Sequence, residues 1–263
     1  MKLAKDYLIF PLDVATLDDA RRYIDLLSNR VGLFKIGLEL FTKIGPTIVR
    51  TVRERSGGAG IFLDLKLHDI PQTVRRTMAV IADMGVTFTT VHCGDAKAML
   101  EAAVEGAGDS VKILGVTVLT SISAADLPAM GYSDVFSRDM SRLVLKRATE
   151  AKAAGFSGVV CSGREAGLIK THLGAQFLAV TPGIRPAREL KNTQDQKRVL
   201  TPAAAIQNGA DYIVVGRPIR DAAAPAAAAD KIISEIEAAL IQFDSKIPPS
   251  LDKKELDTPV NLV

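Results

Sequence analysis

Short apolar runs alternate with amphipathic segments along nearly the whole chain, and this alternation restricts the possible folds more than any other feature. Eight runs have the length and composition of buried strands, at residues 7–12, 32–36, 60–64, 87–91, 111–118, 157–161, 177–180 and 212–215. Helical patterns follow them, at residues 17–27, 38–53, 72–84, 96–105, 141–154, 164–171, 202–207 and 224–243. In the third of these, Val74, Met78 and Ile81 recur at the spacing of one buried helical face.

Eight strand–helix units predict a closed parallel (β/α)8 barrel, the TIM barrel fold, because each parallel connection needs a crossover helix. An open doubly wound sheet is the alternative, but no Gly-x-Gly-x-x-Gly motif follows the first strand. We expect a single barrel domain over residues 1–244, and a C-terminal extension or disordered tail over residues 245–263. The long connections 120–139 and 181–201 would lie on the barrel face where active sites are built.

Charge and cysteine content exclude several classes of protein. The 263 residues have a net charge of +3 and no block of Lys and Arg, so we expect no nucleic-acid partner. The chain begins without a signal-peptide pattern, and no apolar stretch is long enough for a membrane span. Cys93 and Cys161 follow apolar runs, which favours buried thiols in a reducing compartment. His92 beside Cys93, and the isolated His68, do not form a metal-ligand set. These features predict a cytoplasmic protein without a metal or a membrane partner.

Charged residues of alternating sign follow the first three predicted strands. The first strand ends with Asp13, the second with Lys35, and the third leads into Asp64 and Lys66. Because side chains alternate along a strand, Asp64 and Lys66 would emerge on one face, about 7 Å apart along the chain. Any one of these charges could be part of a solvated rim or a structural ion pair. Four of them after apolar strands favour a site that holds an anionic substrate and moves a proton.

A second motif, near the end of the chain, is typical of phosphate binding. The run 212–215 leads into Gly216 and Arg217, and the run 177–180 leads into a loop that contains Arg185. Glycine lets a ligand approach the backbone, and arginine offers a forked cationic donor. In (β/α)8 barrels the loops after the seventh and eighth strands often bind phosphate. The pair of motifs therefore predicts a phosphate site.

Taken together, these motifs resemble the orotidine 5′-phosphate decarboxylase family over nearly the full chain. The matching segments are Leu12-Asp13, Phe34-Lys35-Ile36-Gly37, Asp64-Leu65-Lys66-Leu67-His68-Asp69-Ile70-Pro71-Gln72-Thr73, Val118-Leu119-Thr120-Ser121, Thr181-Pro182-Gly183-Ile184-Arg185 and Gly216-Arg217-Pro218. Related sugar-phosphate decarboxylases share a bare Asp-x-Lys-x-x-Asp, so Ile70-Pro71 and the phosphate motifs carry the discrimination. The resemblance implies a cofactor-free carboxy-lyase that converts orotidine 5′-monophosphate to UMP and carbon dioxide in pyrimidine biosynthesis, as a homodimer.

The resemblance also implies a role for each matching residue. Lys66 would protonate C6 of the pyrimidine as carbon dioxide leaves, and Asp64 would face the substrate carboxylate. Lys35 would belong to the same catalytic array, and Asp69 would reach with Thr73 into the site of the neighbouring subunit. The substrate-binding residues would be Asp13 and Lys35 at the ribose, Thr120 at the pyrimidine edge, and Arg185, Gln196, Gly216 and Arg217 at the phosphate, with Gln194 as an alternative to Gln196.

Two other functions are open from the residues alone. One is a related barrel that acts on another sugar phosphate, as a metal-dependent decarboxylase or an aldolase. Against it, Lys35 and Lys66 stand where metal ligands would be preferred. The other is a non-catalytic barrel that binds a nucleotide, which would need Arg185 and Arg217 but not the pair of Asp64 and Lys66.

Overall fold

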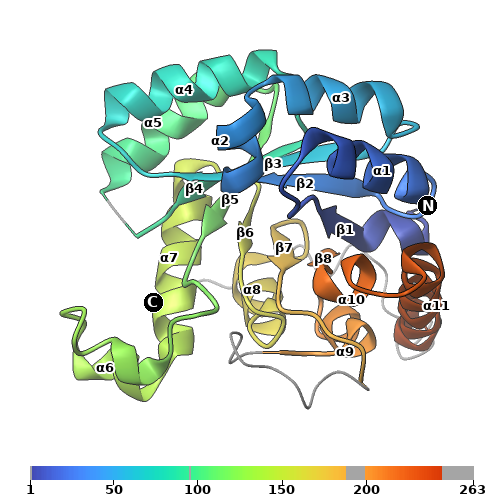
Figure 1. Ribbon diagram of the computed structural model, residues 1–263. Helices are drawn as coiled ribbons and strands as arrows, with labels where there is room; N and C mark the ends of the chain where they lie inside the picture. Colours follow the sequence, from blue (N-terminus) through green and yellow to red (C-terminus); the bar gives the residue numbers. More distant parts are fainter. Residues whose placement is uncertain (1, 95, 188–198, 245–263) are drawn as a thin grey trace.

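Eight parallel strands close into a barrel in the computed structural model, which describes residues 2–94, 96–187 and 199–244 (Figure 1). The strands follow one another around the barrel in chain order, and β1 pairs with β8 to close it. Their bounds are β1 Leu8–Pro11, β2 Leu33–Gly37, β3 Gly60–Leu67, β4 Phe88–His92, β5 Lys112–Val116, β6 Gly158–Val160, β7 Leu178–Thr181 and β8 Tyr212–Val214. The predicted (β/α)8 fold and its eight strands are confirmed, although β3 continues past the expected end at residue 64.

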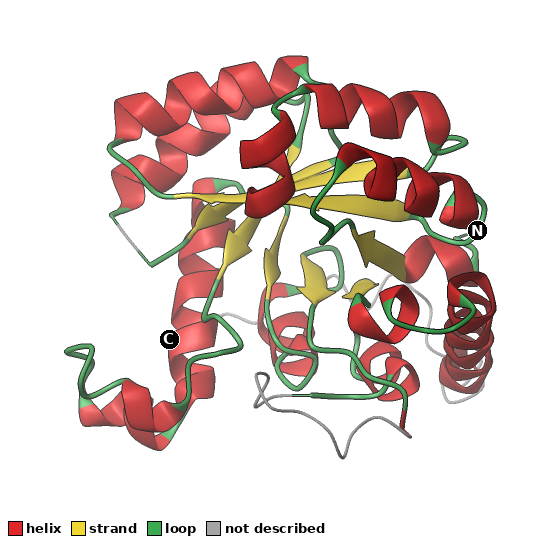
Figure 2. Ribbon diagram, viewed as in Figure 1, coloured by secondary structure: helices red, strands yellow, loops and turns green. Residues whose placement is uncertain are grey.

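Helices cover the outside of the barrel (Figure 2). Their bounds are η1 Ala4–Tyr7, α1 Leu17–Leu27, α2 Leu38–Ile44, α3 Thr47–Arg55, α4 Pro71–Asp83, α5 Lys97–Ala107, η2 Ala124–Asp126, α6 Asp134–Arg138, α7 Met140–Ala154, α8 Ala166–Leu173, α9 Pro202–Gln207, α10 Arg217–Arg220 and α11 Pro225–Asp244. The expected single helix over residues 38–53 is wrong. Gly45 ends α2 with a φ of 68°, and a second helix, α3, starts after Pro46.

Four short helical segments lie where the sequence pattern predicts none. The connection 120–139 contains η2 and α6, which project away from the barrel in Figure 1. Another short helix, η1, precedes β1, and α10 directly follows the loop after β8. All four segments have three to five residues, which is too short for an apolar period to be read.

Helices α4 and α5 show how local sequence sets the packing. Pro71 occupies the first turn of α4, where its missing N–H is not needed. The predicted apolar stripe of α4 is buried. On α5, a Cβ atom at Gly106 would lie 2.2 Å from the carbonyl oxygen of Arg75 in α4. Glycine at this position therefore allows the two helices to approach closely.

Large apolar side chains fill the inside of the barrel. One buried cluster consists of Ile9, Leu33, Phe62, Phe88, Leu114 and Val180. Phe88 packs edge-on against Phe62 and Tyr212, with ring centroids 6.1 and 5.2 Å apart. The Lys2 ammonium lies 3.5 Å from the centroid of the Tyr212 ring. Because Phe88 and Tyr212 are the first residues of β4 and β8, this packing closes the amino-terminal end and leaves the carboxyl ends of the strands for a cavity.

No helix in the described part of the chain is long and apolar enough to cross a membrane. Residues 245–263, for which we expect an extension or a disordered tail, lie outside the described residues. The domain boundary at residue 244 therefore stays a prediction.

Candidate active site

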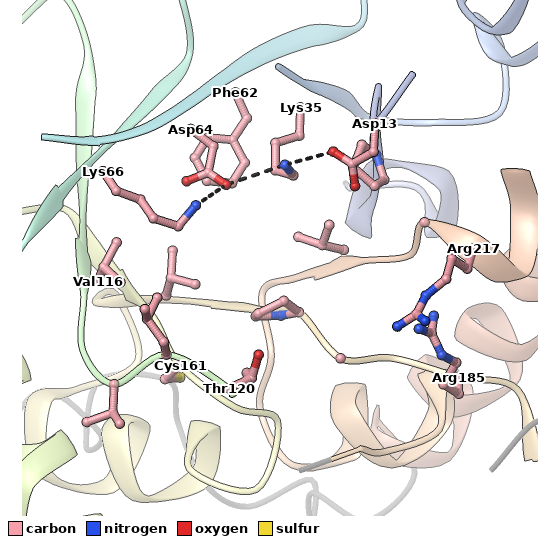
Figure 3. A pocket seen from close by; sticks show the side chains of 18 residues that line it. Asp13, Lys35, Phe62, Asp64, Lys66, Val116, Thr120, Cys161, Arg185 and Arg217 are labelled. Carbon is pink, nitrogen blue, oxygen red and sulfur yellow. Dashed lines mark hydrogen bonds and ion pairs between the residues drawn. The ribbon is translucent and has the colours of Figure 1, made fainter. Parts of the chain in front are cut away.

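A cavity of about 260 Å³ lies at the carboxyl ends of the strands (Figure 3). Its lining comes from both predicted motifs and from apolar residues between them. The lining residues are Pro11, Asp13, Lys35, Phe62, Asp64, Lys66, Val116, Val118, Leu119, Thr120, Val160, Cys161, Pro182, Gly183, Arg185, Val214, Gly216 and Arg217. One cavity thus brings together eight of the predicted site residues, Thr120 among them, from distant parts of the chain.

Lys66 lies on an irregular part of β3 that aims its side chain. Its φ is 52°, in the left-handed region that residues other than glycine rarely adopt. The pairing of β3 with β4 shifts register between Leu63 and Leu67, as in a β-bulge. The Lys66 N–H donates to Thr90 Oγ1 at 2.8 Å, and Lys66 Nζ donates to Asp64 Oδ2 at 2.8 Å. The two charged groups meet as expected, but through a bulge rather than through regular strand alternation.

The Asp64 carboxylate is 7% exposed and is held by three side chains. Thr90 Oγ1 donates to Oδ1 at 2.9 Å, and the ammonium groups of Lys66 and Lys35 lie 2.8 and 3.4 Å from Oδ2. Burial alone would raise the pKa of Asp64. The two ammonium groups and the hydrogen bonds outweigh burial and hold the pKa of Asp64 below its usual value. A buried negative charge is therefore fixed beside the Lys66 ammonium.

Lys35 extends this contact into a line of four charges. Its Nζ lies 3.5 Å from Asp13 Oδ1 and 3.4 Å from Asp64 Oδ2. Figure 3 shows the line running from Asp13 through Lys35 and Asp64 to Lys66. Lys35 sits within β2 rather than at its end, and Asp13 lies two residues beyond β1. The predicted alternation of charge is therefore present as a chain of direct contacts.

Two arginines line the opposite end of the cavity. In Figure 3 the guanidinium groups of Arg185 and Arg217 lie beside one another, at the side of the cavity remote from Lys66. Arg185 is 8% exposed, and its N–H donates to the Leu200 carbonyl at 3.0 Å. A Cβ atom at Gly216 would lie 2.9 Å from Pro11 Cγ, so glycine is required there by the approach of β1. Two adjacent cations are suited to an anion placed between them.

Comparison with known proteins identifies the family. The model of the Orotidine 5′-phosphate decarboxylase / HUMPS family matches residues 6–232. The chain belongs to this family. It is 56% identical over 236 residues to "Orotidine 5′-phosphate decarboxylase" of Desulfosudis oleivorans, covering 90% of this chain and 95% of that protein. It is 45% identical over 240 residues to the protein of the same name in Pelobacter propionicus, covering 89% and 97%.

A solved structure agrees with the sequence comparison. The crystal structure of orotidine 5′-phosphate decarboxylase from Lactobacillus acidophilus matches with a TM-score of 0.74 and 36% identity, over 87% of this chain and 98% of that one. The resemblance that the sequence motifs indicate is thus confirmed. This member of the orotidine 5′-phosphate decarboxylase family has most of its motif residues around one cavity.

One predicted catalytic residue, Asp69, and one predicted substrate-binding residue, Thr73, lie outside that cavity. Asp69 and Thr73 are exposed, and with His68 they line a second hollow of about 300 Å³ between the end of β3 and α4. Lys66 lines both hollows. Gln196, and its alternative Gln194, lie outside the described residues.

Thr90 and the apolar wall are site features that the sequence analysis missed. Thr90 lies on β4 and contacts both Asp64 and Lys66. Val116, Val160 and Val214, from β5, β6 and β8, line the cavity beside the charges. None of these residues lies within the sequence motifs that indicate the family. A weak signal for Thr90 is a hydroxyl within an apolar strand, because a buried polar group needs a partner.

The remaining candidate ligand residues do not gather into a metal site. Cys93 is buried, its thiol donates to the Val116 carbonyl at 3.1 Å, and burial raises the pKa of Cys93 to about 12. Within the ranges that the structure describes, no group of three His, Cys, Asp or Glu side chains is placed to hold a metal ion.

Proposed function

We propose that this protein decarboxylates orotidine 5′-monophosphate to UMP and carbon dioxide without a cofactor, with Lys66 as the proton donor to C6. The observation that carries the proposal is the contact of Lys66 with buried Asp64 at one end of a cavity whose other end holds Arg185 and Arg217. The curated relatives, 45 and 56% identical over nearly their whole length, are named for this activity.

The chemical difficulty is the negative charge that develops at C6, which the pyrimidine ring cannot delocalise. A fixed ammonium group at that position stabilises the charge without reorganising, and does so more strongly in a cavity that excludes water. Lys66 supplies this cation and then the proton. Asp64 faces the departing carboxylate and opposes its charge in the bound substrate. The negative charge of Asp64, which its lowered pKa maintains at neutral pH, keeps the Lys66 ammonium oriented.

The rest of the cavity accommodates the rest of the nucleotide in this proposal. Asp13 and Lys35, at the end of the line of charges away from Lys66, bind the ribose hydroxyls, and Thr120 meets the pyrimidine edge. The groups assigned to the phosphate are Arg185, Gln196, Gly216 and Arg217. Phosphate contacts far from C6 provide binding energy that organises the reacting end.

We further propose a homodimer in which each subunit completes the other's site. Asp69 and Thr73 are exposed on the hollow beside the catalytic cavity, and Lys66 lines both. Ile70 between them is 66% exposed, although it is a large apolar side chain. A partner that covers Ile70 would receive the Asp69 carboxylate next to its own Lys66.

Both cysteines are free and buried, which agrees with the proposed cytoplasmic location.

The decisive experiment is to incubate the protein with orotidine 5′-monophosphate and follow the loss of its ultraviolet absorbance. We expect loss of absorbance with release of UMP and carbon dioxide. Binding without turnover would favour a non-catalytic nucleotide-binding barrel. Turnover only of another sugar phosphate would favour the related decarboxylase or aldolase.

Thr90→Val should lower turnover while preserving the size of the side chain. The change removes the donor to Asp64 and the acceptor for the Lys66 N–H. Since hydrogen bonds to charged groups are involved, we expect kcat to fall about 10- to 100-fold. Thr89→Val is the matched control, because Thr89 is equally buried on the same strand but donates to the Leu63 carbonyl. Equal rates for the two variants would contradict the role of Thr90.

Exhaustive chelation should leave the rate of decarboxylation unchanged. In the proposed mechanism the cations near the reacting carboxylate are Lys66 and Lys35. The measurement is the initial rate after dialysis against a strong chelator. A loss of rate that magnesium restores would favour the metal-dependent alternative.

A further inference from the structure

Helix α10, which starts at the phosphate end of the cavity, carries a second arginine with a different environment. Arg217 lines the cavity, whereas Arg220, one turn later, contacts the loop after β1. Arg220 Nη1 donates to the Asp13 carbonyl at 3.0 Å. Arg220 thus joins α10 to the loop after β1. That loop contains Asp13, the member of the line of charges farthest from Lys66.

The direction of this contact is fixed by Asp221. Arg220 Nε and Nη2 donate to the two Asp221 carboxylate oxygens at 2.6 and 3.1 Å, a bidentate arrangement that sets the plane of the guanidinium. The Arg220 carbonyl also accepts a hydrogen bond from the Tyr23 hydroxyl of α1 at 2.9 Å. The Asp221 side chain is 53% exposed, so the ion pair adds little stability. The ion pair instead sets the geometry, because Nη1, the nitrogen that does not bind Asp221, then points at the Asp13 carbonyl.

Within the line of charges, Asp13 is the residue whose position depends most on a contact from outside the line. It lies beyond β1, and its side chain is 52% exposed, whereas those of Lys35 and Asp64 are 13 and 10% exposed. Within the part of the chain that the structure describes, its side chain pairs only with Lys35, at 3.5 Å. An exposed ion pair of this length does not hold a loop in place. The bond from Arg220 to the backbone of Asp13 does so from the other side.

We propose that Arg220 is a positioning residue that joins the phosphate end of the site to the line of charges by holding Asp13. The inference rests on the proposed function, because it assigns Arg217 to the phosphate and Asp13 to the ribose. When phosphate bound to Arg217 fixes the position of α10, Arg220 fixes the position of Asp13. Asp13 in turn holds Lys35, which contacts Asp64 at the reacting end. The alternative is that Arg220 only adds positive charge near the phosphate.

Two variants separate these roles by steady-state kinetics with orotidine 5′-monophosphate. Arg220→Lys keeps the charge but loses the fork, whereas Arg220→Met loses both. We expect both variants to lower kcat about tenfold, because each loses an oriented charged hydrogen bond. A rise in KM in Arg220→Met alone, with wild-type behaviour in Arg220→Lys, would overturn the proposal in favour of a charge effect.

The matched control is Arg30→Met. Arg30 also pairs with an aspartate, Asp230, at 2.9 Å and donates to a backbone carbonyl, that of Leu26. It lies between α1 and β2, at the other end of the barrel. We expect wild-type kcat in this variant, and a loss equal to that in Arg220→Met would overturn the proposal. If Arg220→Met does not fold, Asp221→Asn is used instead, because it frees the guanidinium plane and should give a smaller loss of kcat.

A double-mutant cycle tests whether Arg220 acts through Asp13. Asp13→Asn keeps the backbone carbonyl but removes the carboxylate from the charge line. In that background we expect Arg220→Met to lower kcat by less than about twofold, since two residues that act through one contact are not additive. A full tenfold loss in both backgrounds would overturn the inference alone. No turnover by the wild-type protein would overturn the proposed function and this inference together.

Discussion

Replacing Lys66 with alanine is expected to abolish decarboxylation and to leave the barrel folded. The variant removes the only side chain assigned both to stabilise the charge at C6 and to protonate it. A single preorganised donor in other active sites contributes about 10²- to 10³-fold, so loss of a cation that is also the proton source should exceed about 10³-fold. Asp64 would still have Lys35 at 3.4 Å and Thr90 at 2.9 Å, so its buried charge would not be left alone.

The measurement is the initial rate with orotidine 5′-monophosphate, together with thermal unfolding. Lys97→Ala is the control, because Lys97 has a side chain that is 75% exposed and pairs with Glu101 on the surface of α5. It should have the wild-type rate and nearly the wild-type melting temperature. A Lys66→Ala variant that is folded and keeps a rate within about tenfold of wild type would contradict the proposed mechanism.

Mixing two inactive variants, Lys66→Ala and Asp69→Ala, is expected to restore activity. In a dimer with shared sites, the heterodimer contains one site with the Lys66 of one subunit and the Asp69 of its partner. Random reassociation of equal amounts would make about a quarter of all sites intact. The geometric reason is that Asp69 faces a hollow outside its own cavity, while Lys66 lines both.

The control for this experiment is a mixture of Lys66→Ala and Asp64→Ala. Both residues belong to the same cavity and contact each other at 2.8 Å. No exchange of subunits can bring them together in one intact site, so this mixture should stay inactive. Recovery in both mixtures, or in neither, would argue against sites shared through Asp69. Reassociation is confirmed by following the dimer in the same samples.

The sequence predicts the barrel well because the required signal is local. Each strand is a short apolar run, each helix has a period of 3.6 residues, and eight repeats leave few alternatives. The errors occur where a segment is too short to show a period, as in α6 and α10, or where Gly45 breaks a continuous apolar pattern. The motifs around Lys66 and Arg217 indicate the family for the same local reason, because each lies within a few consecutive residues.

Other parts of the site are decided only in three dimensions. At the irregular part of β3, the Lys66 N–H donates to the Thr90 hydroxyl, 24 residues later in the chain. Asp69, five residues after Asp64, lies beyond the end of β3 and lines the second hollow rather than the cavity. The contact of Arg220 with Asp13 spans 207 residues. No local pattern encodes such pairs.

The sequence by itself determined the (β/α)8 barrel, the family and the two groups of charged residues that follow the strands. Apolar periods and consecutive motifs carry that information within each segment of chain. The tertiary structure decided which of these residues share a cavity, how β4 supports the Lys66 side chain, and which apolar side chains form the wall between the charges. These outcomes follow from closure of the sheet, because a closed barrel brings the ends of all eight strands together regardless of their distance in the chain.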